Sequence, residues 1–200
     1  SLRRMRVSMV GNTISQVEPS TASYKGLRGS GTAEEPYMIN SVQSLVSFAG
    51  SLKQDSLYHG FGLYFKLGCD IDMTDYYSDP FRVMDQGWCG IGGGFAGNFD
   101  GGGFTISSMV HSDSGNSDVG LFKELLDEAV VSNLTLDQVN ISAAWNNVGA
   151  VAGTTSGNVK LKGITVSGNI EAMGEYAGGL VGKAGNGTLK IEDCILKSLG

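Results

Sequence analysis

The sequence predicts an all-β protein that folds as a right-handed parallel β-helix, a solenoid in which each turn of the chain stacks on the one before it. Three observations lead to this prediction. Glycine supplies 31 of the 200 residues and proline only 3, short β-prone runs are separated by glycines, and the second half of the chain repeats with a fixed period. The glycine share is about twice the usual share of roughly 7%, which suits many tight turns between short strands.

The first 30 residues are predicted to form a β-hairpin and a linker. Two β-prone runs within residues 7–17 flank the pair Gly11 and Asn12, and such a pair suits the tight turn of a hairpin. Residues 18–32 are rich in Ser, Thr, Gly and Pro, a composition typical of a loop. We therefore assign residues 1–30 to an N-terminal hairpin and linker segment.

Residues 31–118 are predicted to supply a short capping α-helix and the first coils of the β-helix. Asn40 or Ser41 can cap a helix that extends to Leu52, because apolar residues recur at helical spacing along it. An open solenoid end leaves backbone groups unpaired and must be covered, so we expect this helix to lie over the first coil. Strands joined by sharp corners are expected to follow it.

Residues 119–200 carry an internal repeat that belongs to the same β-helix. The motif VGLF begins at Val119, VGAVAG at Val148 and AGGLVG at Ala177, so the spacing is 29 residues twice. A unit of this length with short strands and no helix cannot bury its apolar side chains alone. Stacking the units solves this problem, because each strand then pairs in parallel with the next unit about 4.8 Å away.

Stacking also predicts columns of equivalent residues. One column is expected to hold large apolar side chains, and another is expected to hold glycines, where a missing side chain permits close packing or a corner. The apolar column consists of Phe122, Val151 and Leu180, and the glycine column of Gly120, Gly149 and Gly178.

The order of these motifs resembles that of the GLUG-motif proteins, a family named for a Gly-Leu-hydrophobic-Gly signature. The resemblance covers residues 31–200; residues 179–182 match the signature fully, whereas residues 150–153 read Ala-Val-Ala-Gly. In that family such repeats occur in bacterial surface and secreted proteins, including adhesin-like and IgA-peptidase-like ones. The resemblance implies a β-helix and an extracellular location, and it supplies no active site.

Composition excludes several classes of partner. The net charge of -6 and the pI near 4.8 argue against nucleic acid or an anionic membrane as a ligand. No apolar run approaches the roughly 18 residues of a membrane helix, so no membrane insertion of this segment is expected. Three cysteines are too few for a disulfide framework; Cys69 and Cys89 either pair with each other or remain buried thiols.

Acidic residues supply the only candidates for catalysis or metal binding. Asp72 and Asp100 could act as opposed carboxylates, and Asp70, Asp72 and Asp75 could bind Ca²⁺. The alternative is that these aspartates accept backbone hydrogen bonds at strand ends. Because no Arg or Lys partner accompanies them, we expect no catalytic site and no cofactor.

Aromatic residues supply the candidate ligand site. Exposed aromatic rings can stack on sugar rings, and the residues assigned to carbohydrate binding are Tyr76, Tyr77, Trp88 and Trp145. The alternative is that they cover the helix end as core residues.

The predicted function is therefore a non-catalytic, adhesin-like bacterial surface module that forms part of a larger extracellular protein. It would bind carbohydrate or a cell-surface or matrix protein, or display other domains. A carbohydrate-active β-helix enzyme is the alternative, and a structural spacer is the third candidate.

Overall fold

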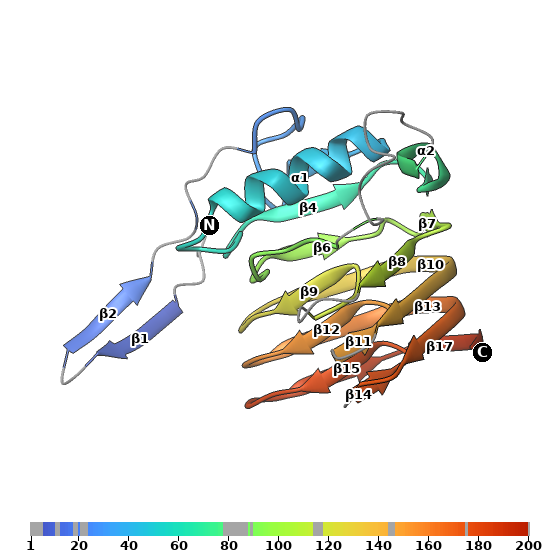
Figure 1. Ribbon diagram of the computed structural model, residues 1–200. Helices are drawn as coiled ribbons and strands as arrows, with labels where there is room; N and C mark the ends of the chain where they lie inside the picture. The colour runs from blue at the N-terminus through green and yellow to red at the C-terminus, as the bar shows by residue number, and fades with distance from the viewer. Residues whose placement is uncertain are drawn as a thin grey trace.

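The computed structural model is a stack of short strands with a helix over one end (Figure 1). It describes residues 6–10, 13–17, 20, 24–77, 88, 90–113, 118–143, 147–174 and 176–199. Among these residues every strand pair outside the N-terminal hairpin is parallel. The predicted all-β fold with parallel sheets is confirmed.

The largest sheet runs through the whole stack. Its main path, in spatial order, consists of β3 (Tyr37–Ile39), β4 (Tyr64–Leu67), β6 (Asn98–Asp100), β10 (Val130–Ala143), β13 (Val159–Ala172) and β16 (Leu189–Glu192). Beyond a corner, the same sheet includes β5 (Ile71–Asp72), β7 (Thr105–Ser107), β8 (Val110–Asp113) and β17 (Ile195–Leu199).

Two smaller parallel sheets complete the stack. One consists of β9 (Phe122–Leu125), β12 (Ala152–Thr155) and β15 (Val181–Ala184). The other pairs β11 (Asn147–Gly149) with β14 (Tyr176–Gly178). Neighbouring strands in all three sheets come from successive units of the sequence, so each sheet grows by the stacking of units.

The unit length is the one that the repeat predicts at the repeated motif, whereas several strand pairs outside it are one residue further apart in the sequence. Val119 pairs with Val148 and Val148 with Ala177, which confirms the period of 29 residues. In the large sheet Val131 pairs with Leu161, which is a spacing of 30 residues. A bulge after Leu136 removes the additional residue, because a bulge lets two residues of one strand oppose one of its partner.

The predicted apolar column is wrong by one residue. Phe122 pairs with Ala152, and Ala152 pairs with Val181, instead of Val151 and Leu180. The second and third units have one more residue than the first between the repeated glycine and this strand. A corner absorbs this residue, so the period of the motif letters does not give the register of the strand that follows.

The predicted glycine column is confirmed, and Gly149 shows why it is needed. Gly149 pairs with Gly178 of the next unit. A Cβ atom on Gly149 would lie 2.6 Å from the amide nitrogen of Gly182 and 2.7 Å from the carbonyl oxygen of Leu180. Real Cβ atoms do not approach backbone this closely, so only glycine fits where the units meet at this corner.

A second corner depends on left-handed backbone. Asn133, Gly163 and Asp193 have φ angles of 52°, 63° and 52°, and they stack because the residues preceding them are paired in register. Glycine, Asn and Asp tolerate this conformation better than other residues. The three units therefore turn at the same place in the stack.

The predicted helix is present as α1 (Val42–Gln54), and it lies over the first strands (Figure 1). The hydroxyl of Ser41 caps it by accepting a hydrogen bond from the Ser44 amide at 3.2 Å. Phe48 faces the stack and packs 4.6 Å from the ring of Phe65 and 5.9 Å from that of Phe95, centroid to centroid. A second, single-turn helix is α2 (Thr74–Tyr77).

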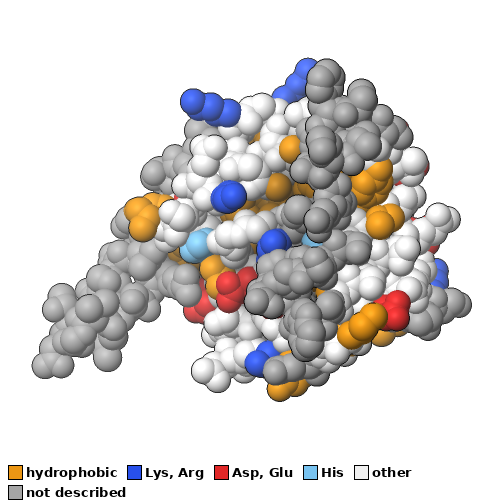
Figure 2. Space-filling model, viewed as in Figure 1, with side chains coloured by type: hydrophobic (Ala, Val, Ile, Leu, Met, Phe, Trp, Pro, Cys, Tyr) orange, Lys and Arg blue, Asp and Glu red, His pale blue; other side chains and the backbone are white. Residues whose placement is uncertain are grey.

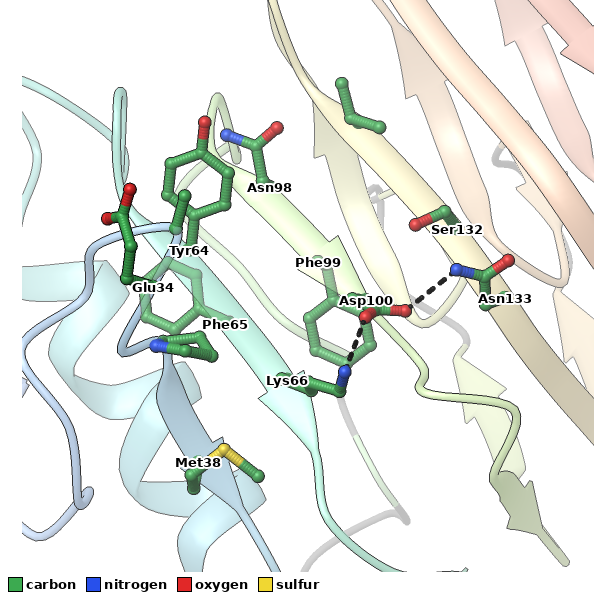
Figure 3. Close-up of a pocket in the computed structure, with 13 residues that line it drawn as sticks. Glu34, Met38, Tyr64, Phe65, Lys66, Asn98, Phe99, Asp100, Ser132 and Asn133 are labelled. Atoms are coloured by element: carbon green, nitrogen blue, oxygen red, sulfur yellow. Dashed lines mark hydrogen bonds and ion pairs between the residues drawn. The ribbon is translucent and has the colours of Figure 1, made fainter. Parts of the chain in front are cut away.

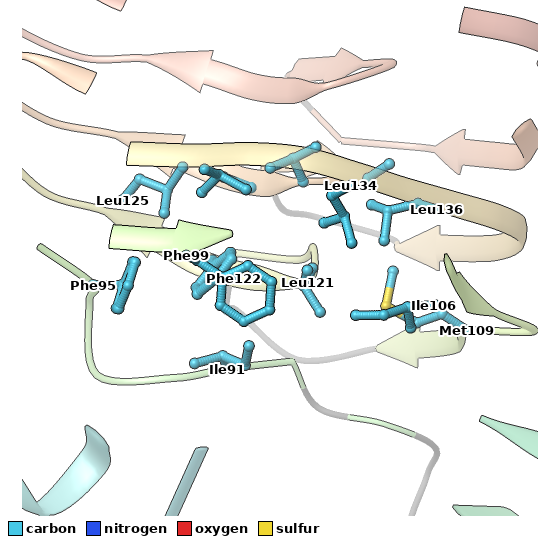
Figure 4. Close-up of a cluster of buried hydrophobic side chains, with 14 of the residues drawn as sticks. Ile91, Phe95, Phe99, Ile106, Met109, Leu121, Phe122, Leu125, Leu134 and Leu136 are labelled. Carbon is cyan, nitrogen blue, oxygen red and sulfur yellow. The ribbon is translucent and has the colours of Figure 1, made fainter. Parts of the chain in front are cut away.

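The core is a continuous column of apolar side chains between the sheets (Figure 4). Phe122 stacks on Phe95 at a centroid distance of 4.9 Å and meets Phe99 edge to face at 5.5 Å. Leu134 and Leu136 continue the column toward the next corner, and both are buried. Area removed from water by such side chains supplies the main favourable free energy of folding.

The N-terminal hairpin is also present. β1 (Arg6–Val10) and β2 (Thr13–Val17) pair antiparallel in a sheet of their own. The predicted turn residues Gly11 and Asn12 lie outside the described residues. No helix in the described part of the chain has the length and apolar character to cross a membrane.

Candidate functional site

A groove of about 530 Å³ crosses the outer face of the large sheet (Figure 3). Strands β4, β6 and β10 form its floor, and the segment before and within β3 forms one wall. Its lining residues are Ala33, Glu34, Pro36, Met38, Tyr64, Phe65, Lys66, Asn98, Phe99, Asp100, Val130, Ser132 and Asn133. This surface combines polar and apolar side chains.

Strand alternation explains which side chains face the groove. Phe65 and Phe99 pair with each other and point into the core, so the residues on either side of them point outward. Tyr64 therefore lies beside Asn98, and Lys66 lies beside Asp100. The floor consists of two outward columns that run across the strands.

Asp100 is the centre of the polar cluster. Its Oδ1 accepts hydrogen bonds from the Gly102 amide at 2.9 Å and from Nδ2 of Asn133 at 3.0 Å. Its Oδ2 forms an ion pair with Nζ of Lys66 at 3.2 Å. Burial raises the pKa of the Asp100 carboxyl, but the bonds from Gly102, Asn133 and Lys66 together lower it below its ordinary value. Asp100 is therefore ionised and held in place.

Tyr64 supplies an aromatic surface at the edge of the cluster. Its side chain is 36% exposed, and Figure 3 shows it between Glu34 and Asn98. A flat apolar ring beside amide and charged groups can pack against a ligand that itself has apolar and polar faces. The groove therefore combines a stacking surface with hydrogen-bond donors and acceptors.

The acidic residues predicted for metal binding have separate partners. Asp70 accepts a hydrogen bond from the Thr105 amide at 2.8 Å, and Asp72 accepts from the amide and hydroxyl of Thr74. The amide and hydroxyl of Thr74 lower the pKa of Asp72. Asp75 is exposed in α2. Within the described residues no group of three or more His, Cys, Asp or Glu side chains could hold a metal ion.

The two aspartates predicted as a catalytic pair also occupy different places. Asp100 ends β6 on the groove floor, whereas Asp72 ends β5 beyond the corner and pairs with Ser107. Only Asp100 lines the groove. Asp72 instead accepts hydrogen bonds at the end of a strand, as the alternative interpretation of these aspartates predicted.

The aromatic residues predicted to bind sugar are mostly buried. Trp88 is 4% exposed and Tyr76 is 8% exposed, and their rings pack edge to face at 5.5 Å. The hydroxyl of Tyr77 donates to the carbonyl oxygen of Val110 and accepts from its amide, each at 2.8 Å. The exposure that this prediction requires is therefore absent at Trp88 and Tyr76, and Trp145 lies outside the described residues.

Cys69 is a free, half-buried thiol that donates to the carbonyl oxygen of Asn40 at 3.1 Å. Cys89, its proposed partner, lies outside the described residues.

The sequence analysis missed most of the groove, in particular Lys66, Asn98 and Asn133. The signal that could have found them is the alternation around Phe65 and Phe99, once the two strands are set side by side.

No protein-family model matches the sequence. Halomucin from Haloquadratum walsbyi is 30% identical over 179 residues, which is 82% of this chain and 2% of halomucin. A "Putative Gly-rich membrane protein" from Evansella cellulosilytica is 34% identical over 134 residues, which is 64% of this chain and 14% of that protein. The chain therefore spans a small part of each of these relatives.

Among solved structures, a putative immunoglobulin A1 protease from Bacteroides ovatus aligns with a TM-score of 0.46 at 18% identity. The alignment covers 85% of this chain and 59% of that one. The chain is thus similar in sequence to short stretches of two much longer proteins, one of them named as a membrane protein.

Proposed function

We propose that this chain is a section of a right-handed parallel β-helix that serves as a non-catalytic, adhesin-like module of an extracellular surface protein. Its proposed ligand is a carbohydrate, bound in the groove across β4, β6 and β10. The right hand is supported by the general rule that about 98% of crossovers between parallel strands of one sheet are right-handed. Residues 179–182, which read Gly-Leu-Val-Gly, support placing the chain among the GLUG-motif proteins.

The location outside the cell is supported by the relatives. One of them is named a membrane protein, and both are far longer than the matched region. A stiff stack of similar units can extend a binding surface away from an envelope without needing a complex sequence.

The groove carries the proposal of a carbohydrate ligand. A sugar ring has an apolar face of C–H groups and a rim of hydroxyls, so it requires both an aromatic surface and polar partners. Tyr64 offers the surface, and Asn98, Asn133 and the Lys66–Asp100 pair offer the partners. The ion pair presents donors and an acceptor with no net charge, a combination that suits hydroxyl groups.

The state of Asp100 favours binding over catalysis. A glycosidase uses two carboxyl groups, and its general acid must have a raised pKa. The donors around Asp100 lower its pKa instead, and they occupy both of its oxygens. A residue held in this way is suited to orient a ligand.

Binding can be tested on a glycan array that holds neutral and acidic polysaccharides. Tyr64→Ala should weaken retention about tenfold, because it removes the aromatic surface on which the sugar ring packs. Tyr176→Ala is the matched control, since Tyr176 is 44% exposed on β14 and does not line the groove. Absence of binding to every glycan, or equal loss in both variants, would exclude this function for the groove.

A carbohydrate-active enzyme remains the second candidate because Glu34 and Asp100 line the same groove. The array ligands can be incubated with the protein and assayed for new reducing ends. We expect none above a blank. Release of reducing ends that disappears in both Glu34→Gln and Asp100→Asn would support the enzyme instead.

A further inference from the structure

We infer that the ligand of the groove is an acidic glycan, one whose sugars carry carboxylate or sulfate groups, and that lysines beside the groove bind these groups. This inference rests on the proposed function and names its ligand class. It depends on charges that lie immediately next to the groove floor.

The strand register places two lysines along one edge of the groove. Lys160 pairs with Val130, and Lys162 pairs with Ser132; both partners line the groove. Neighbouring strands lie about 4.8 Å apart, which is within the reach of a lysine side chain. An anionic group on a ligand in the groove can therefore contact either lysine without leaving the floor.

The positive charge at this edge is only partly compensated. Glu192 accepts from Nζ of Lys160 at 2.9 Å and from Nζ of Lys190 at 2.6 Å, so one carboxylate serves two lysines. The bonds from Lys190 and Lys160 lower the pKa of Glu192 to about 2. Lys162 is exposed, and no ion pair of Lys162 occurs among the described residues.

The charge balance of this face differs from that of the whole chain. Before the corner at Asn133, Gly163 and Asp193, the outward positions of this sheet carry four lysines and two carboxylates: Lys66, Lys160, Lys162, Lys190, Asp100 and Glu192. The whole chain has a net charge of -6. On the face of the molecule that Figure 2 shows, both basic and acidic side chains are present.

The remaining acidic group of the groove gives the ligand a direction. Glu34 lines the groove on the side of Tyr64, as Figure 3 shows, whereas Lys160 and Lys162 belong to β13, which follows β10 in the sheet. Coulomb attraction and repulsion both favour a ligand whose sugar ring packs on Tyr64 and whose anionic groups lie over β13. Uncharged hydroxyls then face Asn98 and the Lys66–Asp100 pair.

Affinity electrophoresis of the whole chain can test this with matched polysaccharides. The first pair is polygalacturonate and its methyl ester, and the second is a sulfated galactan and the same galactan after desulfation. We expect each acidic member to retard the protein at least about tenfold more strongly than its neutral partner. The pair with the larger difference between its acidic and neutral members then tells whether the groove prefers carboxylate or sulfate.

Variants assign the effect to the lysines. Lys160→Gln with Lys162→Gln should remove about tenfold of the affinity for the acidic member and leave affinity for the neutral one unchanged. Lys197→Gln removes an exposed lysine on β17, beyond the corner, and should change neither. Raising the salt from 0.05 M to 0.5 M should weaken only acidic binding, because salt screens exposed charges.

The outcomes separate this inference from the proposed function. Equal binding of acidic and neutral members, with loss in Tyr64→Ala, would overturn the acidic ligand and keep a glycan-binding groove. The inference would also be overturned if Lys197→Gln weakened binding of the acidic polysaccharide as much as the double variant does. Failure of every polysaccharide to bind, on the array and here, would instead remove the proposed function.

Discussion

Asp55 joins three parts of the N-terminal cover through one carboxylate. It is 6% exposed, and its Oδ2 accepts hydrogen bonds from Oγ of Ser20 at 2.8 Å, the Tyr24 hydroxyl at 3.1 Å and the Gly60 amide at 2.8 Å. Burial and the neighbouring carboxylate raise the pKa of Tyr24, so its hydroxyl stays protonated as a donor. A buried carboxylate is tolerated because each donor compensates part of its lost hydration.

Replacing Asp55 should therefore destabilise the fold more than its size suggests. Asp55→Ala removes the acceptor shared by two hydroxyls and an amide, and we expect the free energy of unfolding to fall by about 3 kcal/mol. Tyr24→Phe removes only one bond and should cost about 1 kcal/mol. Urea unfolding measures both, with exposed Asp75→Ala as the control, expected within about 0.5 kcal/mol of the parent. If Asp55→Ala matches Asp75→Ala, the hydrogen-bonded cluster contributes nothing to stability.

At the scale of the elements, the chain changes direction where a residue can adopt left-handed backbone. The corner at Gly163 has a φ of 63° and is followed directly by the rest of β13. The helix α1 instead contains Gly50 at an ordinary helical position, with open space where a Cβ atom would lie. The same residue type thus serves a turn in one element and weakens the other, since glycine in a helix interior is unfavourable.

Alanine at these two glycines should have opposite effects. Gly163→Ala places a Cβ atom in left-handed backbone and should lower the free energy of unfolding by about 1 kcal/mol. Gly50→Ala should raise it by about 0.5 to 1 kcal/mol, because alanine favours helix and has room there. Thermal and urea unfolding of the two variants and the parent measure this difference. A stabilising Gly163→Ala would contradict the corner described for β13.

The same elements show how far sequence patterns reach. The helix and its Ser41 cap, the parallel pairing of the repeat and the glycine column could be predicted, because capping, periodicity and close packing are local or repeat in each unit. The column at Phe122 could not, because one additional residue in a corner shifts the register without changing the motif spacing. The groove was missed for a related reason: Tyr64 and Asp100 lie 36 positions apart, and only strand register brings them together.

At the scale of the whole molecule, each unit contacts only the units beside it. The stack is covered at one end by α1, where Leu45, Phe48 and Leu52 are buried, and its last strands leave large apolar side chains exposed. In such an arrangement stability depends on how many neighbours a unit has. Two residues at equivalent positions, one in a unit with a neighbour on each side and one in the last unit described, therefore show how neighbouring units affect stability.

Leu161 and Ile191 are such a pair. They are partners in the register of β13 and β16, but Leu161 is fully buried and Ile191 is 48% exposed. Leu161→Ala should lower the free energy of unfolding by about 2 to 5 kcal/mol, because it leaves a cavity between two units. Ile191→Ala should cost less than about 1 kcal/mol. Hydrogen exchange should agree, with the amides of β16 exchanging faster than those of β10. Equal costs at the two positions, together with equal exchange in the two strands, would mean that the stack unfolds as one cooperative body and that the number of neighbours does not set local stability.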